Sequence, residues 1–389
     1  MHFHRLKTPK NSVIDLLVIA GEHSGDELAA DFVKELKSKH PDLNVACIGG
    51  SKLEEAGACL IFNLLNRSVF GFIDVLKNYG FFKLLFKETI TWIELYQPKH
   101  ICCVDYPGFN LRIAKELKKK GLSRKGGGAI SVHHYVSPQI WAWKPNRRFA
   151  MAQYLDSLAV LLPFEPRHYK DTDLPTTYVG HPFAMSDYEL SLKYDPEGPI
   201  LLLPGSRQKV VEHIAPIILE AFAALAKNDK VAQAVIIYPS LIIKSVLKRC
   251  LSHHPELKDR VTLIKNDFSQ LKARAAIMSS GTMSLSVALL GIPGIIVYKL
   301  SRLNYFIIKQ LVHVPYISLA NLILEKEIYP ELIQASANKE NITQAFNSIV
   351  ADEAIEGRCQ KNAKDLKHLL FDKREMSAAH WLSTRMNLS

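Results

Sequence analysis

The chain has few cysteines and no pattern among them that binds zinc or performs redox chemistry. Its six cysteines in 389 residues form no C-x-x-C pair and no zinc-type ladder with histidine. Cys102 and Cys103 are adjacent in an apolar run, which predicts buried strand residues. We therefore expect no metal site and a reducing compartment.

Long apolar runs are also missing. The longest candidate, residues 283–298, is interrupted by Gly291, Pro293 and Gly294, so no stretch has the length of a transmembrane helix. The basic N-terminus has no apolar segment directly behind it, which argues against a signal peptide.

Acidic residues are outnumbered, with 38 Asp and Glu against 49 Lys and Arg, and the formal net charge is +11. This balance suits an anionic partner: nucleic acid, anionic lipid or a phosphorylated substrate. We expect no nucleic acid, because no recognisable nucleic-acid-binding module is present.

The length predicts two domains. Short apolar runs alternate with amphipathic stretches in both halves, which predicts an α/β fold with two doubly wound, mostly parallel sheets facing a cleft. The runs predicted as strands are 15–20, 45–49, 100–104, 129–133 and 157–162 in the first half, and 200–203, 234–238, 261–264, 275–279 and 294–298 in the second. The rhythm lapses near residues 180–199. We place the domains at 1–185 and 186–357, and expect the tail to be helical and basic.

Two loops in the second half follow predicted strands and open predicted helices. Residues 201–207 read LLLPGSR, and residues 278–284 read MSSGTMS. Free amides at a helix start attract phosphate, a glycine allows close approach, and an arginine adds charge. Neither loop matches G-x-G-x-x-G or a Walker lysine loop, so we expect no dinucleotide or ATP cofactor. The candidate phosphate-binding residues are Gly205, Ser206, Arg207, Ser280, Gly281 and Thr282.

In the first half, Asp105 stands just past a predicted strand, where open α/β sheets carry catalytic groups. It could be a general base or the cap of the next helix. The loop 20–26, AGEHSGD, could line a sugar site, although Ser24 or Asp26 could simply cap its helix.

Residues 133–144, HHYVSPQIWAWK, combine histidines, tryptophans and a serine, which suggests a cleft wall. We expect no zinc site here, because adjacent strand residues point to opposite faces. Residues 70–86, FGFIDVLKNYGFFKLLF, form either a core helix or a segment that touches a membrane. The candidate membrane contacts are Phe70, Phe72, Phe81, Phe82 and Phe86.

These motifs together resemble the lipid-A-disaccharide synthase family. IAGEHSGDELAA, SVFGFIDVL, VDYPGFN, HYVSPQIWAW, LPFE, VGHP, LLLPGSR, SSGT and ISLANLILEKEIYPELIQ occur in the family's order, over residues 16–334. The resemblance implies a GT-B fold with two Rossmann-like domains. It implies transfer of diacylglucosamine from UDP to the 6-hydroxyl of diacylglucosamine 1-phosphate, with inversion and without a metal.

The resemblance also implies roles for particular residues. Asp105 is the candidate catalytic base. Ser286 and Asn321 join the two loops at the donor site, and the acceptor side is expected to include Glu22, Ser24, Gly25, His134 and Ser137. The implied partners are the acylated UDP-glucosamine, the acylated glucosamine 1-phosphate and the cytoplasmic face of the inner membrane of a Gram-negative cell. A homodimer and a C-terminal helix, 358–389, packed on the first domain are further expectations.

Four positions depart from the family pattern. Gly108 stands where a second aspartate is usual, Ser286 where a glutamate is usual, Val210 where an acid is usual, and Ala320 where a proline is usual. They keep two alternatives open: a divergent paralogue with a different UDP-sugar donor, and a catalytically weakened, membrane-bound homologue.

Overall fold

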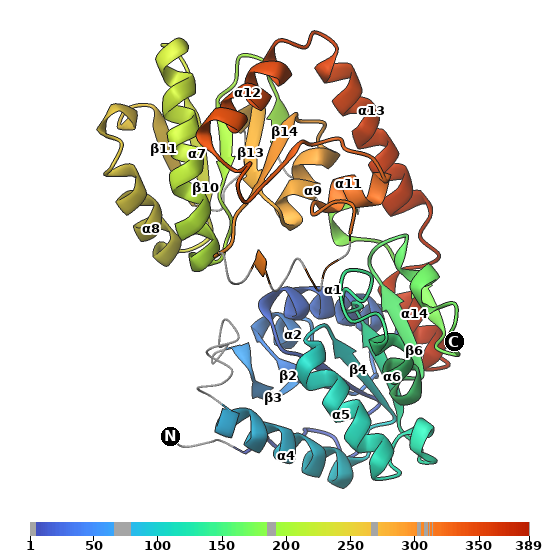
Figure 1. The fold of residues 1–389 in the computed structure, drawn as a ribbon. Helices are drawn as coiled ribbons and strands as arrows, with labels where there is room; N and C mark the ends of the chain where they lie inside the picture. The colour runs from blue at the N-terminus through green and yellow to red at the C-terminus, as the bar shows by residue number, and fades with distance from the viewer. Residues whose placement is uncertain are drawn as a thin grey trace. The chain divides into compact units, whose positions relative to one another are not determined.

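The computed structural model describes residues 5–65, 79–184, 192–265, 271–301, 305–306, 310, 312 and 314–388. The chain forms two compact units, Met1–Pro182 with Arg374–Ser389, and Phe183–Lys373 (Figure 1). The expected boundary at 185/186 therefore lies at 182/183. The C-terminal segment belongs to the first unit from Arg374 onward, and not from residue 358.

The first unit has a sheet of seven parallel strands in the order β3-β2-β1-β4-β5-β6-β7. Their bounds are β1 Leu16–Ala20, β2 Val45–Gly49, β3 Cys59–Asn63, β4 His100–Val104, β5 Ser131–Tyr135, β6 Ser157–Val160 and β7 Thr176–Tyr178. The chain builds outward from β1 through β3, then returns to place β4 on the other side of β1. Such a switch in strand order is where open α/β sheets bind ligands.

Helices cover both faces of this sheet, and each face has its own apolar core. One face carries α1 His23–Lys39, α2 Ser51–Glu55 and α14 Ala378–Arg385, and the other carries α4 Tyr79–Tyr96, α5 Pro107–Lys119 and α6 Arg147–Tyr154. Cys102 and Cys103 are fully buried and belong to opposite cores, which confirms their prediction as buried strand residues.

The second unit repeats the same winding with six parallel strands in the order β11-β10-β9-β13-β14-β15. Their bounds are β9 Ile200–Leu203, β10 Ala234–Tyr238, β11 Val261–Lys265, β13 Ala275–Ser279, β14 Gly294–Tyr298 and β15 Glu331–Ile333. A separate parallel pair joins β8 Lys193–Tyr194 to β12 Lys272–Ala273. Here the strand order switches between β9 and β13.

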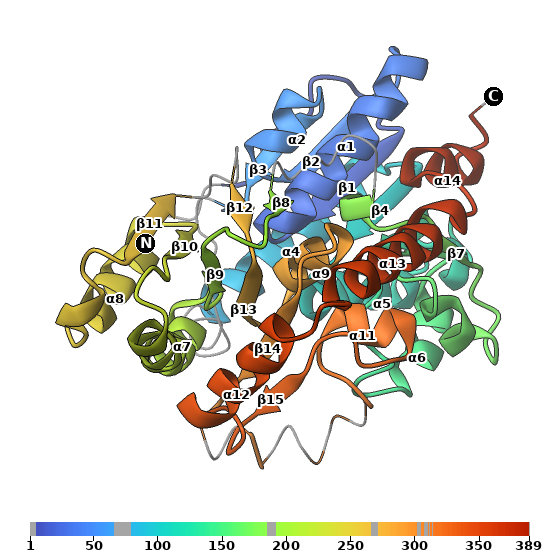
Figure 2. The same cartoon turned by 90° about the horizontal axis from the view of Figure 1, so that it is seen from above.

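Two helix layers enclose this second sheet (Figure 2). The helices α7 Gln208–Asn228, α8 Leu241–Leu251 and α12 Lys339–Val350 share one apolar core with the strands. The helices α9 Thr282–Leu289, α11 Leu319–Leu324 and α13 Ile355–Lys367 pack against one another. The predicted fold class, two doubly wound parallel sheets, is thus confirmed in each unit.

Local differences from the predicted elements have simple causes. The short strands β3, β7 and β15 were not predicted, and each includes polar or partly exposed residues that weaken an apolar signal. The strand predicted at 129–133 lies at 131–135, so His133 and His134 both belong to β5. Residues 23–26, predicted as loop, form the first turn of α1.

Candidate active site

The switch point of the first unit brings the loop after β1 against the loop after β4. A Cβ atom on Gly21 would lie 2.3 Å from Cδ1 of the Tyr106 ring, so only glycine fits there. Asp105 and Tyr106 both have left-handed backbone conformations, with φ of 48° and 47°. Such conformations are costly for residues other than glycine and persist only where neighbouring contacts impose them.

Hydrogen bonds to its main-chain amide and carbonyl hold Asp105 in this conformation. Its amide donates to the carbonyl of Tyr135 at the end of β5 (2.9 Å), and its carbonyl accepts from Nδ2 of Asn110 (2.8 Å). Asn110 is buried in α5 and also donates to the carbonyls of Ile19 and Val104. One amide therefore joins β1, β4 and the Asp105 turn.

The Asp105 carboxyl has the electrostatics of a general base. Burial raises its pKa to about 6, and the negative charge of Glu22 adds to the increase. A pKa close to the working pH favours proton transfer in both directions. Asp105 is therefore ionised at neutral pH yet basic enough to accept a proton.

The loop AGEHSGD is arranged differently from the prediction. Glu22 is the exposed N-cap residue of α1, and Ser24 is exposed in its first turn. Gly25 is buried against the Val104 carbonyl. Asp26 does not cap its own helix: its Oδ1 and Oδ2 accept from the amides of Gly50 (2.6 Å) and Lys52 (3.1 Å), and so cap α2.

His134 and Ser137, predicted at the acceptor side, are buried beneath the surface. The Oγ of Ser137 donates to the Pro138 carbonyl and shares a 2.7 Å hydrogen bond with the hydroxyl of Tyr169. His134 is fully buried, burial lowers its pKa to about 4, and neither ring nitrogen makes a hydrogen bond of normal geometry. Both side chains therefore lie inside the first unit, and their place on the acceptor side stays a prediction.

His133 faces the other side of β5. Its Nε2 lies 3.1 Å from Nδ1 of His100, its Nδ1 lies 2.8 Å from Oγ of Ser157, and its ring meets the edge of Trp381. Among the described residues there is no cluster of three or more histidines, cysteines or carboxylates placed to hold a metal ion.

The sequence analysis gave Glu165 no role, although this residue ends the LPFE motif that the chain shares with the family. It is buried, and one oxygen accepts from Nε1 of Trp141 (3.3 Å) while the other accepts from the amides of Leu161 and Leu162. Burial raises its pKa to about 7. This carboxyl ties the WAW segment to the chain after β6.

In the second unit, the two predicted phosphate loops meet at the switch point between β9 and β13. Gly205 has φ of 115°, and a Cβ there would lie 3.0 Å from Oγ of Ser279 and 3.3 Å from Cγ1 of Val210. The left-handed φ favours glycine here, and an added Cβ would be in tight contact with both side chains. Ser206, Arg207, Gly281 and Thr282 are exposed around this contact, and Ser280 donates from Oγ to the Ile317 carbonyl (2.7 Å).

The other two predicted donor residues are enclosed. Ser286 is 1% exposed inside α9, and its Oγ has no hydrogen-bond partner in the described structure. Asn321 is fully buried, and its amide is saturated: Nδ2 donates to the Tyr329 carbonyl and to Glu331, and Oδ1 accepts from the amides of Ile328 and Tyr329. Asn321 therefore anchors the chain that follows α11, and its predicted role at the nucleotide site stays a prediction.

The acid that the family usually has at position 210 is not replaced by the nearby carboxylate of Glu212. Val210 packs against Gly205 and the apolar core. Glu212 accepts from Gln208 (2.9 Å) and from Arg249 (3.4 Å), and so pairs with α8.

Three of the five predicted membrane contacts lie in α4, whereas Phe70 and Phe72 lie outside the described residues. Phe81, Phe82 and Phe86 are half-buried and pack on the core of the first unit. Ring contacts run from Phe81 to Phe82 and on to Tyr106. The aromatic row therefore reaches the ring that covers Gly21. In the described part of the chain, no helix combines the length and apolarity that crossing a membrane requires.

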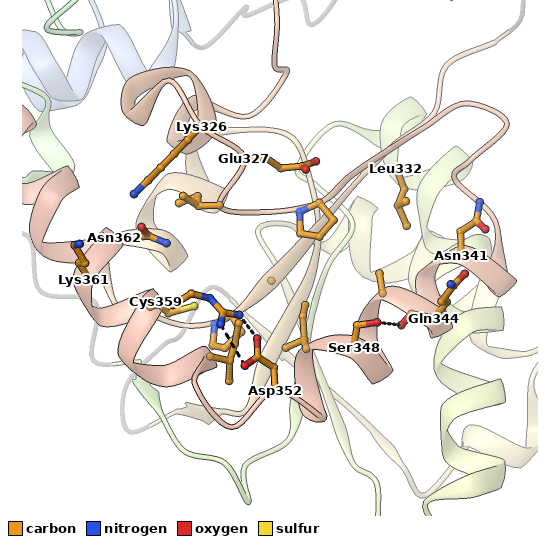
Figure 3. Close-up of a pocket in the computed structure, with 18 residues that line it drawn as sticks. Lys326, Glu327, Leu332, Asn341, Gln344, Ser348, Asp352, Cys359, Lys361 and Asn362 are labelled. Carbon is orange, nitrogen blue, oxygen red and sulfur yellow. Dashed lines mark hydrogen bonds and ion pairs between the residues drawn. The ribbon is translucent and has the colours of Figure 1, made fainter.

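A hollow of about 790 Å³ in the second unit is lined by residues of α12, α13 and the chain before β15 (Figure 3). It lies at the amino ends of the parallel strands, whereas the phosphate loops follow the carboxyl ends. It adjoins Gly294, which begins β14, and Pro330, which precedes β15. Its charged wall includes the ion pair between Asp352 and Arg358. It therefore differs in position from the predicted donor site.

Comparison with known proteins agrees with the family resemblance of the sequence motifs. The model of a family described as lipid-A-disaccharide synthetase matches residues 16–383. The lipid-A-disaccharide synthase of Coxiella burnetii (strain Dugway 5J108-111) is 34% identical over 339 residues, covering 84% of this chain and 86% of that relative. Lipid-A-disaccharide synthase 1 of Legionella pneumophila (strain Philadelphia 1) is 33% identical over 348 residues, covering 87% and 88%.

Solved structures share the fold at low identity. A putative UDP-N-acetylglucosamine 2-epimerase from Listeria monocytogenes gives a TM-score of 0.60 at 11% identity, covering 97% of this chain and 98% of its own. The glycotransferase of kitacinnamycin gives 0.58 at 12% identity, covering 95% and 98%. With the family match over most of its length, the chain belongs to the lipid-A-disaccharide synthase family, hexosyltransferases of lipid A biosynthesis with the GT-B fold.

Proposed function

We propose that this protein transfers 2,3-diacylglucosamine from UDP to the 6-hydroxyl of 2,3-diacylglucosamine 1-phosphate. The products are the β-1,6-linked disaccharide 1-phosphate and UDP, with inversion at the anomeric carbon. The observation that carries the proposal is Asp105, held at the switch point of the first unit with its pKa raised to about 6.

The proposed step is a single displacement. Asp105 removes the proton from the acceptor hydroxyl, the hydroxyl oxygen bonds to the anomeric carbon, and the bond to UDP breaks with its electron pair on the phosphate oxygen. General base catalysis of this kind contributes roughly 10²- to 10⁴-fold.

For the leaving group we propose the loops at Gly205 and Gly281. Free amides at the start of α7 and the Arg207 guanidinium suit the pyrophosphate charge, which grows as the bond to the sugar breaks. We propose that no metal takes part. Turnover that stays unchanged after chelation by EDTA would support this, and turnover restored by a divalent cation would contradict it.

We further propose that the protein binds peripherally at the cytoplasmic face of the inner membrane, because both substrates carry acyl chains. The half-buried aromatic row on α4 supports a lipid-facing side, and Leu84 on the same helix is 39% exposed. The homodimer remains a prediction from the family resemblance.

The test is UDP release with both acylated substrates, using wild type, Asp105→Asn and Asp105→Ala. We expect at least a hundredfold loss in kcat/KM for both variants, with unchanged donor affinity. Equal turnover by wild type and Asp105→Asn would remove Asp105 as the base. Complementation of a synthase-deficient strain by the wild-type gene tests the reaction in the cell.

A second candidate is a different UDP-sugar donor. It rests on the lack of an acid at Val210 and Ser286, since neither position offers a carboxylate for the ribose hydroxyls. A panel of UDP-sugars with one acceptor decides between the two donors. Strict preference for UDP-2,3-diacylglucosamine would contradict the second candidate.

A further inference from the structure

The chain between β5 and α6 gathers two cations on one indole ring. The Lys144 ammonium lies 4.6 Å from the centroid of the Trp143 ring, and the Arg147 guanidinium carbon lies 5.4 Å from it. Lys144 is exposed and has φ of 54°, a left-handed conformation that turns the chain directly after the tryptophan. Both cations are thereby held beside a flat apolar surface.

These two cations lack a negative partner, unlike their neighbour. Arg148 donates to both carboxylate oxygens of Asp171, at 2.6 to 3.0 Å, and to the Pro145 carbonyl. Within the residues that the structure describes, no carboxylate lies within ion-pair distance of Lys144 or Arg147. One basic side chain of this segment is neutralised, and two remain available to an anion.

The segment is anchored to the body of the first unit. Glu165 holds Trp141 through its indole nitrogen, and the Ser137 hydroxyl is bonded to Tyr169. Arg147 is the first residue of α6, so its backbone is fixed by that helix. Ordered cations bind an anion at a lower entropic cost than cations on a free loop.

The segment that carries the two cations follows β5 at the same end of the strands as the proposed base, which follows β4. Strands β4 and β5 are neighbours and parallel, so their carboxyl ends lie together. The Asp105 amide is bonded to the last residue of β5, Tyr135. A ligand at Asp105 therefore has the β5–α6 segment on its adjoining side.

We propose that Trp143, Lys144 and Arg147 form a subsite for the anomeric phosphate of the acceptor. This rests on the proposed function. C5, which carries the reacting 6-hydroxymethyl group, and C1, which carries the phosphate, flank the ring oxygen of the same sugar. A base after β4 and cations after the neighbouring strand β5 would therefore hold these two groups. The ring face of Trp143 offers an apolar surface for the sugar, and the cations select acceptors that carry the charge.

The first experiment compares two acceptors with identical acyl chains, one with the 1-phosphate and one without it. The variants are Lys144→Met, Arg147→Met and the double variant, with Lys170→Met as a control, because Lys170 is an exposed lysine of the same unit that is outside the subsite. For each subsite variant we expect KM for the phosphorylated acceptor to rise roughly ten- to hundredfold, the scale of one charged hydrogen bond. The values for the dephosphorylated acceptor and for the donor should stay as in wild type.

Anionic lipid headgroups present the same phosphate chemistry, and a separate arm distinguishes them. Binding to vesicles of phosphatidylglycerol and phosphatidylethanolamine is measured for wild type and the double variant. Equal vesicle binding with a selective KM effect supports the acceptor subsite. Lost vesicle binding with equal losses on both acceptors would overturn it in favour of lipid attraction.

A binding measurement keeps this proposal separate from the proposed function. The indole resonance of Trp143, assigned with Trp143→Phe, is followed by NMR during titration with soluble glucosamine 1-phosphate. We expect a saturable shift in wild type, a weaker one in each single variant and none in the double variant. An unmoved resonance in wild type would overturn the subsite even if the enzyme is active. A wild type that binds but transfers no sugar would instead contradict the proposed function.

Discussion

Gly21 and Tyr106 lie in direct contact, with the tyrosine ring occupying the space that a side chain at position 21 would need. The distance from an added Cβ to Cδ1 of Tyr106 would be 2.3 Å. This contact joins the loop after β1 to the turn that carries Asp105. It makes the position of the proposed base dependent on a residue that performs no chemistry itself.

We expect Gly21→Ala to displace Tyr106, and with it the neighbouring Asp105. A misplacement of about 1 Å at a reacting group can reduce the rate about a hundredfold. The measurement is kcat/KM for UDP release, with a thermal melt to show that the fold persists. Gly108→Ala is the matched control, because nothing lies within 4 Å of an added Cβ there. Equal losses in both variants would contradict the role of the contact.

The dependence of kcat/KM on pH should reflect the ionisation of the Asp105 carboxyl. Because its pKa is raised to about 6, kcat/KM is expected to increase as pH rises through 6 and to level off above it. Glu22→Gln removes a negative charge that raises this pKa, so the midpoint should move to lower pH. A profile that is flat between pH 5 and about 7 in wild type would exclude the carboxyl as the titrating base.

The same shift has a consequence for stability. A carboxyl whose folded pKa lies above its unfolded value of 3.8 favours folding when neutral. That contribution is complete below the unfolded pKa and is lost as pH rises toward 6. Asp105→Asn, which stays neutral, should therefore be more stable than wild type at pH 7, by up to about 3 kcal/mol. Urea unfolding at pH 4 and pH 7 measures this, and we expect the difference to be smaller at pH 4.

Arg207 is expected to act on the donor. Arg207→Ala should raise KM for the UDP-sugar roughly ten- to hundredfold, because a charged hydrogen bond to phosphate is lost. Arg207→Lys should recover part of that affinity. Arg249→Ala is the control, since Arg249 pairs with Glu212 on the α8 side of α7. An unchanged donor KM in Arg207→Ala would place the pyrophosphate elsewhere.

The Ser286→Ala variant tests whether the Ser286 hydroxyl binds the ribose of the donor or is only enclosed in the protein. The Ser286 hydroxyl is enclosed and unpartnered, so its removal should leave donor KM unchanged and stabilise the fold by about 1 kcal/mol. Chemical denaturation and donor kinetics are measured on the same preparation. A tenfold rise in donor KM would return Ser286 to the donor site.

Trp381 should carry much of the attachment of the C-terminal segment. It is 1% exposed and packs against the rings of His133 and Tyr135. Trp381→Ala is expected to cost about 3–5 kcal/mol of unfolding free energy. Trp381→Phe keeps most of the packing and should cost less. Equal stability of the alanine variant and wild type would show that α14 contributes little to the first unit.

Much of the fold could be predicted because its signals are local. The bounds of β4, β9, β10, β13 and β14 agree with the apolar runs read from the sequence. The start of α1 was missed because Ser24 and Gly25 resemble a loop, although they form its first turn. Side-chain partners were less predictable: Asp26 caps a helix that begins 25 residues later, at Ser51.

The sequence alone determined the alternation of strands and helices, the order of the family motifs, and the position of Asp105 and the two phosphate loops after strands. These follow from apolar periodicity and from glycine and charge along a few consecutive residues. Only the tertiary structure decided which loops meet, because strand order is set by pairings between distant segments. It placed Gly21 against Tyr106 and Gly205 against Ser279. It also enclosed Ser286 and Asn321, since burial depends on the helices packed around them and not on their neighbours in the chain.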